Sequence, residues 1–164
     1  MALFRYLRVY QKFVEMDRPR RLPISTQDFE KLRRQGDIYV DKTQYIAKLL
    51  ALGNVFFLSR PHRFGKSLFL STLKAYFEGK KELFKGLAIE KAEQEMASWQ
   101  GREPWEKHPV LYIELNAERY ATPQDLENTL ETHLAVWEEL YGSDGVAKTH
   151  SSRLAAVVRK AYEK

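Results

Sequence analysis

The stretch Asn54–Ser67, NVFFLSRPHRFGKS, decides the expected fold. Its first six residues form a short apolar run after a Gly-Asn turn, which is typical of a buried strand. The residues Arg60–Ser67 then form a loop, and residues 67–78 carry apolar side chains in a pattern that predicts a helix ending at Gly79. A strand, a loop and a helix in this order are the setting in which a phosphate-binding loop occurs.

The triplet Gly65-Lys66-Ser67 matches the end of the phosphate-loop pattern G-x-x-x-x-G-K-[ST]. Glycine lets the backbone approach a phosphate closely, lysine neutralises the β and γ oxygens, and the serine hydroxyl can bind Mg²⁺. The helix that follows offers unpaired N–H groups and a partial positive charge to an anion. The triplet therefore predicts a nucleotide site in which Lys66 stabilises the phosphate charge.

Two residues depart from that pattern. Arg60 occupies the position of its first glycine, and Pro61 has no backbone N–H to donate. Arg60 and Arg63 are cationic donors that can replace part of the lost contact. A Gly-Lys-Ser triplet also arises by chance in on the order of several per cent of chains of this length, so a loop that binds nothing stays the alternative.

Composition limits the class of protein. A chain of 164 residues is typical of about one domain, and the absence of cysteine excludes a disulfide framework and a thiolate site. No apolar run approaches the roughly 18 residues of a membrane span, and the N-terminus lacks the cleavage site of a signal peptide, so we expect a cytoplasmic protein.

Charge is uneven along the chain. Residues 1–91 carry 19 lysines and arginines against 9 acidic residues, whereas residues 92–164 carry 8 against 13. A basic front half is typical of a protein with an anionic partner. A nucleic-acid-binding or DNA-processing accessory module is therefore the alternative to a nucleotide-binding protein.

The remaining pattern predicts mostly helices. Residues 1–21 form a basic N-terminal extension with an amphipathic helix over 1–18, and residues 22–164 form one domain. Further helices are expected from Ser25 or Thr26 to Gln35, from Asp41 to Gly53, and over 90–99, 123–141 and 152–162. The run 110–115 is expected as a second buried strand, with Glu114 near its end as a candidate carboxylate or as an ordinary exposed residue.

Two blocks of this sequence resemble the predicted AAA-ATPase-like family of bacterial and archaeal proteins. They are LPISTQDFEKLRRQGDIYVDKTQYIAKLL at residues 22–50 and FFLSRPHRFGKSLFLSTLKAYFEGKKELFKGLAI at residues 56–89. The resemblance covers about residues 22–120, including Trp105–Pro109. The phosphate loop of that family also has arginine and proline where this chain has Arg60 and Pro61, and only His62 departs from it.

The resemblance implies an α/β P-loop domain of three layers that binds ATP or ADP with Mg²⁺. It implies that the whole loop contributes to phosphate binding, with Ser67 as the magnesium residue and Val40 and Lys42 as neighbours of the nucleotide. The loop residues are Arg60, Pro61, His62, Arg63, Phe64, Gly65, Lys66 and Ser67.

One element of the family is missing here. Family members continue into an apolar strand that ends in an Asp-Glu pair, the Walker B element, and this chain has no such run. The expected fold is therefore an incomplete P-loop fold, the N-terminal part of an ATPase with weak or no hydrolysis by itself. We also expect it to self-associate or to depend on a missing C-terminal segment, because two apolar strands would have open edges.

Overall fold

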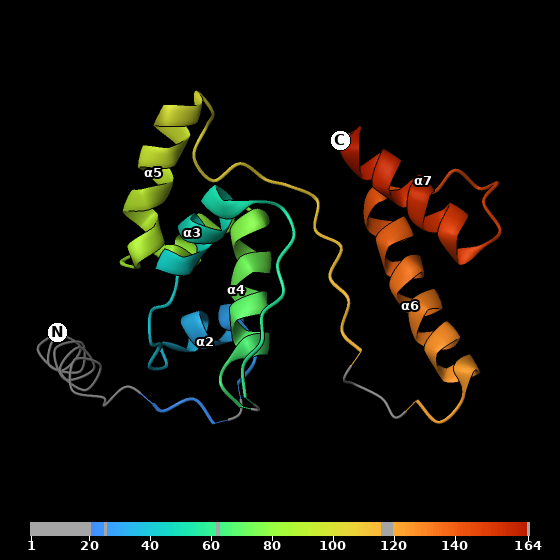
Figure 1. Ribbon diagram of the computed structural model, residues 1–164, viewed down its shortest axis with the longest axis horizontal. Coiled ribbons are helices and arrows are strands. Elements are labelled where there is room, and N and C mark those ends of the chain that lie inside the picture. The colour runs from blue at the N-terminus through green and yellow to red at the C-terminus, as the bar shows by residue number, and fades with distance from the viewer. Residues whose placement is uncertain (1–20, 25, 62, 116–119, 164) are drawn as a thin grey trace, which may run out of the picture. The chain divides into compact units, whose positions relative to one another are not determined.

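The computed structural model describes residues 21–24, 26–61, 63–115 and 120–163. In these ranges all regular elements are helical (Figure 1). They are α2 (Phe29–Gln35), α3 (Gln44–Leu52), α4 (Lys66–Phe77), the 3₁₀ helix η1 (Lys81–Phe84), α5 (Ala88–Gln100), α6 (Pro123–Tyr141) and α7 (His150–Tyr162). The chain divides into two compact units, Met1–Glu106 and Lys107–Lys164.

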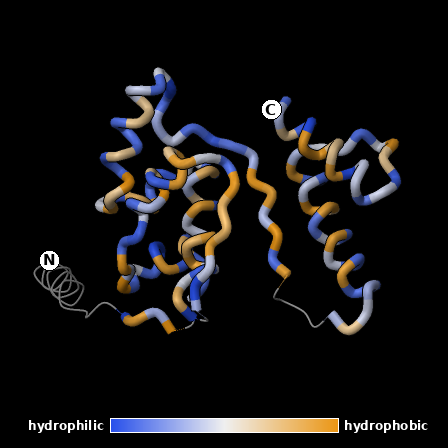
Figure 2. The backbone as a smooth tube through the Cα atoms, viewed as in Figure 1, coloured by the Kyte–Doolittle hydropathy of each residue, from blue (hydrophilic) through white to orange (hydrophobic). Residues whose placement is uncertain are grey.

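The expectation of an α/β P-loop fold is wrong for this structure. Neither 54–59 nor 110–115 is a strand in the described part of the chain, although both are extended. Figure 2 shows both segments as hydrophobic runs outside the helices. Val55 is 93% exposed and Phe57 94% exposed, so the first run is not a buried strand either. A strand requires a ladder of hydrogen bonds to a neighbour, and an apolar run by itself does not supply that neighbour.

The first unit is built around aromatic rings from several short helices. Phe29 of α2 and Phe84 of η1 are fully buried, with ring centroids 5.0 Å apart. The Trp105 ring also packs against Phe84, with centroids 5.1 Å apart, and the ring of Tyr76 in α4 lies 5.7 Å from that of Trp105. Ile46 of α3 and Ile89 of α5 complete this core and are also fully buried, so five of the elements share one core.

Local sequence explains where most helices begin and end. Asp28, not Ser25 or Thr26, caps α2, because its side chain accepts a hydrogen bond from the backbone N–H of Lys31. Thr122 caps α6 in a reciprocal capping box with Asp125, as expected. Gly36 ends α2 in the left-handed conformation with φ of 70°, which a glycine adopts without strain.

The loop before α3 holds the start of α5 in place. Asp41 accepts hydrogen bonds from the N–H and the hydroxyl of Thr43, and its second oxygen accepts one from the N–H of Ala88 at 2.7 Å. The Thr43 hydroxyl accepts from the N–H of Ile89 at 3.1 Å. The sequence predicted Asp41 as the cap of α3, whereas its side chain caps α5 and Thr43 is the residue before α3.

A buried ion pair joins Glu93 of α5 to Arg102, which follows the end of this helix. Glu93 of α5 is 1% exposed and accepts two hydrogen bonds from the Arg102 guanidinium, at 2.6 and 3.1 Å. It also accepts from the Tyr76 hydroxyl and from the Trp105 N–H. Burial raises the pKa of Glu93, but the hydrogen bonds from Arg102, Tyr76 and Trp105 outweigh it and hold this pKa below its usual value.

The second unit is a helical hairpin with an extended segment beside it. Trp137 of α6 and Val157 of α7 are buried together in its small core. The Tyr141 hydroxyl accepts from the N–H of Val110 at 2.9 Å and donates to the Val110 carbonyl at 3.1 Å. His133 Nε2 lies 3.3 Å from the Glu114 carbonyl oxygen, so residues 110–114 run antiparallel to α6. In the described residues no helix is both long and apolar enough to cross a membrane.

Candidate phosphate-binding site

The phosphate loop leads into α4 through two left-handed residues. Gly65, the residue before α4, has φ of 75° and ψ of 26°, which glycine adopts freely. Arg63 has φ of 65°, a conformation that is uncommon for a residue with a side chain. A hydrogen bond from the Phe64 N–H to the Pro61 carbonyl, at 3.4 Å, closes the turn. These dihedrals reverse the chain at the point where the helix begins.

The N-terminus of α4 has no side-chain cap. At the starts of α2, α6 and α7 a backbone N–H donates a hydrogen bond to the side chain of the capping residue. At the start of α5 two N–H groups donate to the side chains of Asp41 and Thr43. The residue before α4 is Gly65, which has no side chain to offer, and the first turn of α4 contains no acidic residue. The first N–H groups of α4, like those of α3, therefore lack a side-chain acceptor, and an anion is the ligand that such a helix end favours.

Cationic and hydroxyl residues lie in the loop before this helix and in its first turn. Lys66 is the first residue of α4 and is exposed, and Ser67 follows it half-buried. The Arg60 guanidinium lies 6.0 Å from the centroid of the Phe69 ring, which holds the start of the loop against α4. Arg63 and Phe64 are exposed, while His62 lies outside the described residues. The arrangement can bind an anion through backbone N–H groups, two arginines and one lysine.

Val40 and Lys42 lie on the neighbouring segment. Tyr39 packs edge-on against Phe29, and its hydroxyl lies near the side chain of Thr72, about a turn and a half into α4 from its start. Val40 is 70% exposed, and Lys42 is half-buried beside Asp41. The structure therefore aligns this segment with the middle of α4, and a role of Val40 and Lys42 at the nucleotide stays a prediction.

Ser67 provides a magnesium ligand of the right chemistry. Mg²⁺ prefers oxygen ligands and keeps several waters, so one hydroxyl and the oxygens of a bound phosphate are a suitable set. Among the residues that the structure describes, no group of three His, Asp or Glu side chains is placed to hold a metal ion. Ser67 is therefore the residue of the loop that could hold a magnesium ion.

Sequence reasoning missed the roles of three residues that the structure makes central. Asp41 and Thr43 flank Lys42, a predicted neighbour of the nucleotide, but their side chains bind the start of α5. Glu93 was not singled out, although a signal exists: Ile89, Glu93 and Ala97 are spaced four apart and all three are buried. Glu114, the candidate carboxylate, is exposed and belongs to the second unit.

Comparison with known proteins identifies the family of the chain. The family model described as a predicted AAA-ATPase matches residues 23–164. An uncharacterised protein from the region 5′ of vnfD in Azotobacter chroococcum mcd 1 is 37% identical over 144 residues, which is 87% of this chain. The chain spans 26% of the length of that relative. No solved structure matches it.

Proposed function

The chain belongs to the predicted AAA-ATPase family, and from this premise we propose that it binds ATP or ADP at Arg60–Ser67. The phosphates would lie at the N-terminus of α4. The observation that carries the proposal is the uncapped start of this helix behind the left-handed Gly65, with Lys66 in its first position. Backbone N–H groups and the helix dipole favour an anion there, and the family match supports a nucleotide as the choice of anion.

Each residue of the loop has a role in the proposal. Lys66 is exposed at the helix start and neutralises the charge on the β and γ oxygens. Ser67 offers its hydroxyl to Mg²⁺, and the ion reduces the repulsion between the phosphates. Arg60 and Arg63 supply donors that offset the N–H that Pro61 lacks, and Arg60 is held in position by Phe69.

Weak or no hydrolysis by this chain alone is part of the proposal. Transfer of the terminal phosphoryl group to water needs a residue that positions the water, and the sequence has no apolar run ending in an Asp-Glu pair. Release of phosphate from ATP by the purified chain measures this directly. Turnover that Glu114→Gln abolishes would give Glu114 the water-positioning role and contradict this part of the proposal.

Titration calorimetry with Mg-ATP tests the binding site. Lys66→Ala is expected to remove most of the affinity, because it deletes the cation that faces the phosphates. Lys74→Ala is the matched control: it lies on the same helix, two turns further on, where its Nζ is 3.9 Å from Glu78. Equal affinities of the wild type and Lys66→Ala would contradict the assignment.

The same variants separate nucleotide binding from nucleic-acid binding. An electrostatic nucleic-acid surface made of many basic residues would lose affinity steeply with salt and little on Lys66→Ala. In a nucleotide site, by contrast, Lys66→Ala alone would remove most of the affinity for the nucleotide, because Lys66 is the cation that faces its phosphates. A titration of single-stranded oligonucleotide at two salt concentrations therefore distinguishes the two functions.

A further inference from the structure

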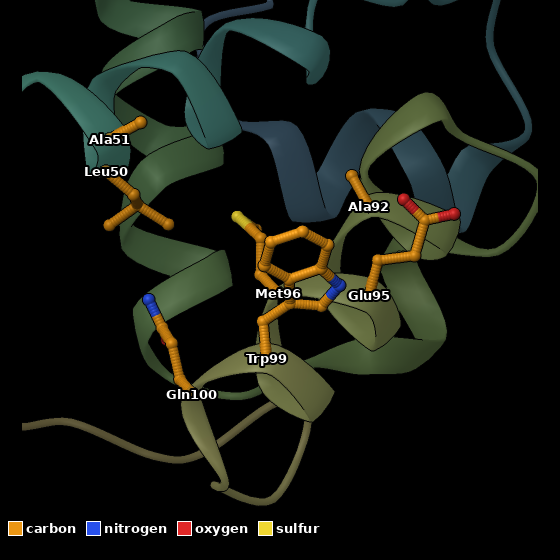
Figure 3. Close-up of a pocket in the computed structure, with 7 residues that line it drawn as sticks. All are labelled: Leu50, Ala51, Ala92, Glu95, Met96, Trp99 and Gln100. Atoms are coloured by element: carbon orange, nitrogen blue, oxygen red, sulfur yellow. The ribbon is translucent and has the colours of Figure 1, made fainter.

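A second candidate site lies between α3 and α5. A pocket of about 520 Å³ is lined by Leu50, Ala51, Ala92, Glu95, Met96, Trp99 and Gln100. Figure 3 shows the Trp99 indole next to Met96 on α5, with Leu50 and Ala51 on α3. Trp99 is 92% exposed, although tryptophan is a large apolar side chain that usually gains from burial. The volume and the mostly apolar lining are typical of a site for a small organic ligand.

Acceptor groups at this pocket lack a donor of their own. Glu95 carries a full negative charge and forms no ion pair within the described ranges. Leu50 and Ala51 lie in the last turn of α3, where a helix presents carbonyl oxygens and partial negative charge. Gly53, the residue after α3, donates no backbone hydrogen bond to that turn, whereas the residue after each of the other described α-helices does. A ligand that donates hydrogen bonds and carries positive charge suits these acceptors.

The basic residue that contacts the lining is already neutralised. Arg102 donates from Nε to the Gln100 side-chain oxygen at 2.7 Å, and its Nη1 donates to the Glu93 carboxylate at 2.6 Å. Neither α3 nor α5 has a basic residue in its last turn. Lys91, four residues before Glu95, forms no ion pair with it. The charge of Glu95 is therefore left to attract a ligand.

We propose that this pocket binds a small organic ammonium ion, a primary amine attached to an aromatic or aliphatic body. The Trp99 indole and the Met96 thioether pack against the body, and the face of the indole attracts the cation. The charge of Glu95 and the partial charge at the end of α3 favour the ammonium group over a neutral or anionic group. The site does not use the phosphate loop, so this proposal and nucleotide binding stand or fall separately.

Binding of dansylcadaverine to the full chain tests this proposal. This probe joins a fluorescent aromatic ring to a primary amine, and N-pentyl dansylamide is the matched neutral compound. We expect dansylcadaverine to saturate the protein in a fluorescence titration, and the neutral compound to bind about fivefold more weakly, because it lacks the cation. No saturation with dansylcadaverine by about 1 mM, or equal affinities of the two compounds, would overturn the proposal.

The methyl signal of Met96 locates the bound probe. Comparison with Met96→Leu identifies this signal in the NMR spectrum of a protein with labelled methionine methyl groups. The ring current of a bound aromatic group acts only at short range, so we expect the Met96 signal to shift during the titration with dansylcadaverine. Saturable binding that leaves this signal unshifted would place the probe elsewhere and overturn the assignment of the pocket.

Variants at exposed positions show which groups hold the amine. Glu95→Gln is expected to weaken dansylcadaverine binding about two- to fivefold at low salt, because it removes the charge and keeps the shape. Trp99→Ala is expected to weaken it about fivefold, and Trp99→Phe, which keeps an aromatic face, should lose less. Glu106→Gln, an exposed acidic control in the same unit, should bind as the wild type does. Wild-type affinity in both Glu95→Gln and Trp99→Ala would contradict the proposal.

Discussion

The carboxylate of Asp41 caps a helix that begins 47 residues later, because its Oδ2 accepts a hydrogen bond from the N–H of Ala88 at 2.7 Å. The hydroxyl of Thr43 accepts a hydrogen bond from the next backbone N–H of α5, that of Ile89. Two residues of one short loop thus supply the capping acceptors of α5, whose own preceding residue, Leu87, has no side chain that can accept a hydrogen bond. The block Tyr39–Thr43 has a structural function whatever it contributes to nucleotide binding.

Replacing Asp41 by alanine is expected to lower the free energy of unfolding by about 1–2 kcal/mol, the usual value of a helix cap. Asp41→Asn keeps an acceptor and should lose less. Burial raises the pKa of Asp41, but hydrogen bonds from Thr43 and Ala88 lower it further, so this pKa lies below its usual value of 3.8. The stability that the charge contributes is complete above pH 3.8 and is lost as the pH falls through the lower pKa of the folded state. Urea unfolding at several pH values measures this, and a pH-independent difference between the wild type and Asp41→Asn would contradict it.

The Glu93–Arg102 pair gives a test of a buried charge. Arg102→Ala leaves the carboxylate of Glu93, which is 1% exposed, without its cation, and is expected to cost about 3–5 kcal/mol. The double variant Glu93→Leu with Arg102→Met removes both charges and should be less destabilising than Arg102→Ala alone. Chemical unfolding of the wild type, Arg102→Ala and the double variant measures their free energies of unfolding. If the double variant is the least stable of the three, this prediction is wrong, and the ion pair itself contributes net stability.

Arg63→Gly should change stability and affinity in opposite directions. Arg63 has φ of 65°, so glycine relieves backbone strain and is expected to stabilise the fold by up to about 1 kcal/mol. The same change removes one cation beside the proposed phosphate site and should weaken Mg-ATP binding. Thermal melts without nucleotide and calorimetry with it measure the two effects. A variant that is both less stable and equally tight in binding would contradict this interpretation of Arg63.

The ion pairs of Arg153 in α7 with Glu131 and Glu138 in α6 should weaken at high salt and in acid. The guanidinium of Arg153 donates to Glu138 at 2.8 and 2.6 Å and to Glu131. Hydrogen bonds from Arg153 hold the pKa values of Glu131 and Glu138 below their usual range, so the link is lost only when the pH falls through these lowered values. Arg153→Ala is expected to lower the melting temperature at low salt, and the difference should shrink at about 1 M salt. Thr132→Ala, an exposed change on the same helix, is the control.

Exposed apolar residues before the loop are expected to cause self-association. Val55 and Phe57 are 93% and 94% exposed and lie in one extended segment. Phe57→Lys should therefore shift light scattering towards the monomer, since it removes an apolar side chain and adds charge. Val158→Lys, at a half-exposed position of α7, is the control. A concentration-independent monomer for the wild type would show that the segment does not drive association.

Local sequence determined most helix ends and the candidate site. Thr122, Pro123 and Asp125 start α6, and Gly36 and Gly53 end α2 and α3, because capping and left-handed conformations depend on a few consecutive residues. The Gly65-Lys66-Ser67 triplet was likewise visible in the sequence, and the structure places it at the start of a helix.

Only the tertiary structure decided the state of the apolar runs and the partners of the buried charges. The runs 54–59 and 110–115 have the composition of buried strands, yet strand formation requires a hydrogen-bonded neighbour from elsewhere in the chain. The same holds for Asp41 with Ala88 and for Tyr76 with Glu93, which are far apart in sequence. Hydropathy and spacing report what one segment favours by itself, whereas a ladder, a distant cap or a buried ion pair forms only when a second segment lies within hydrogen-bonding distance.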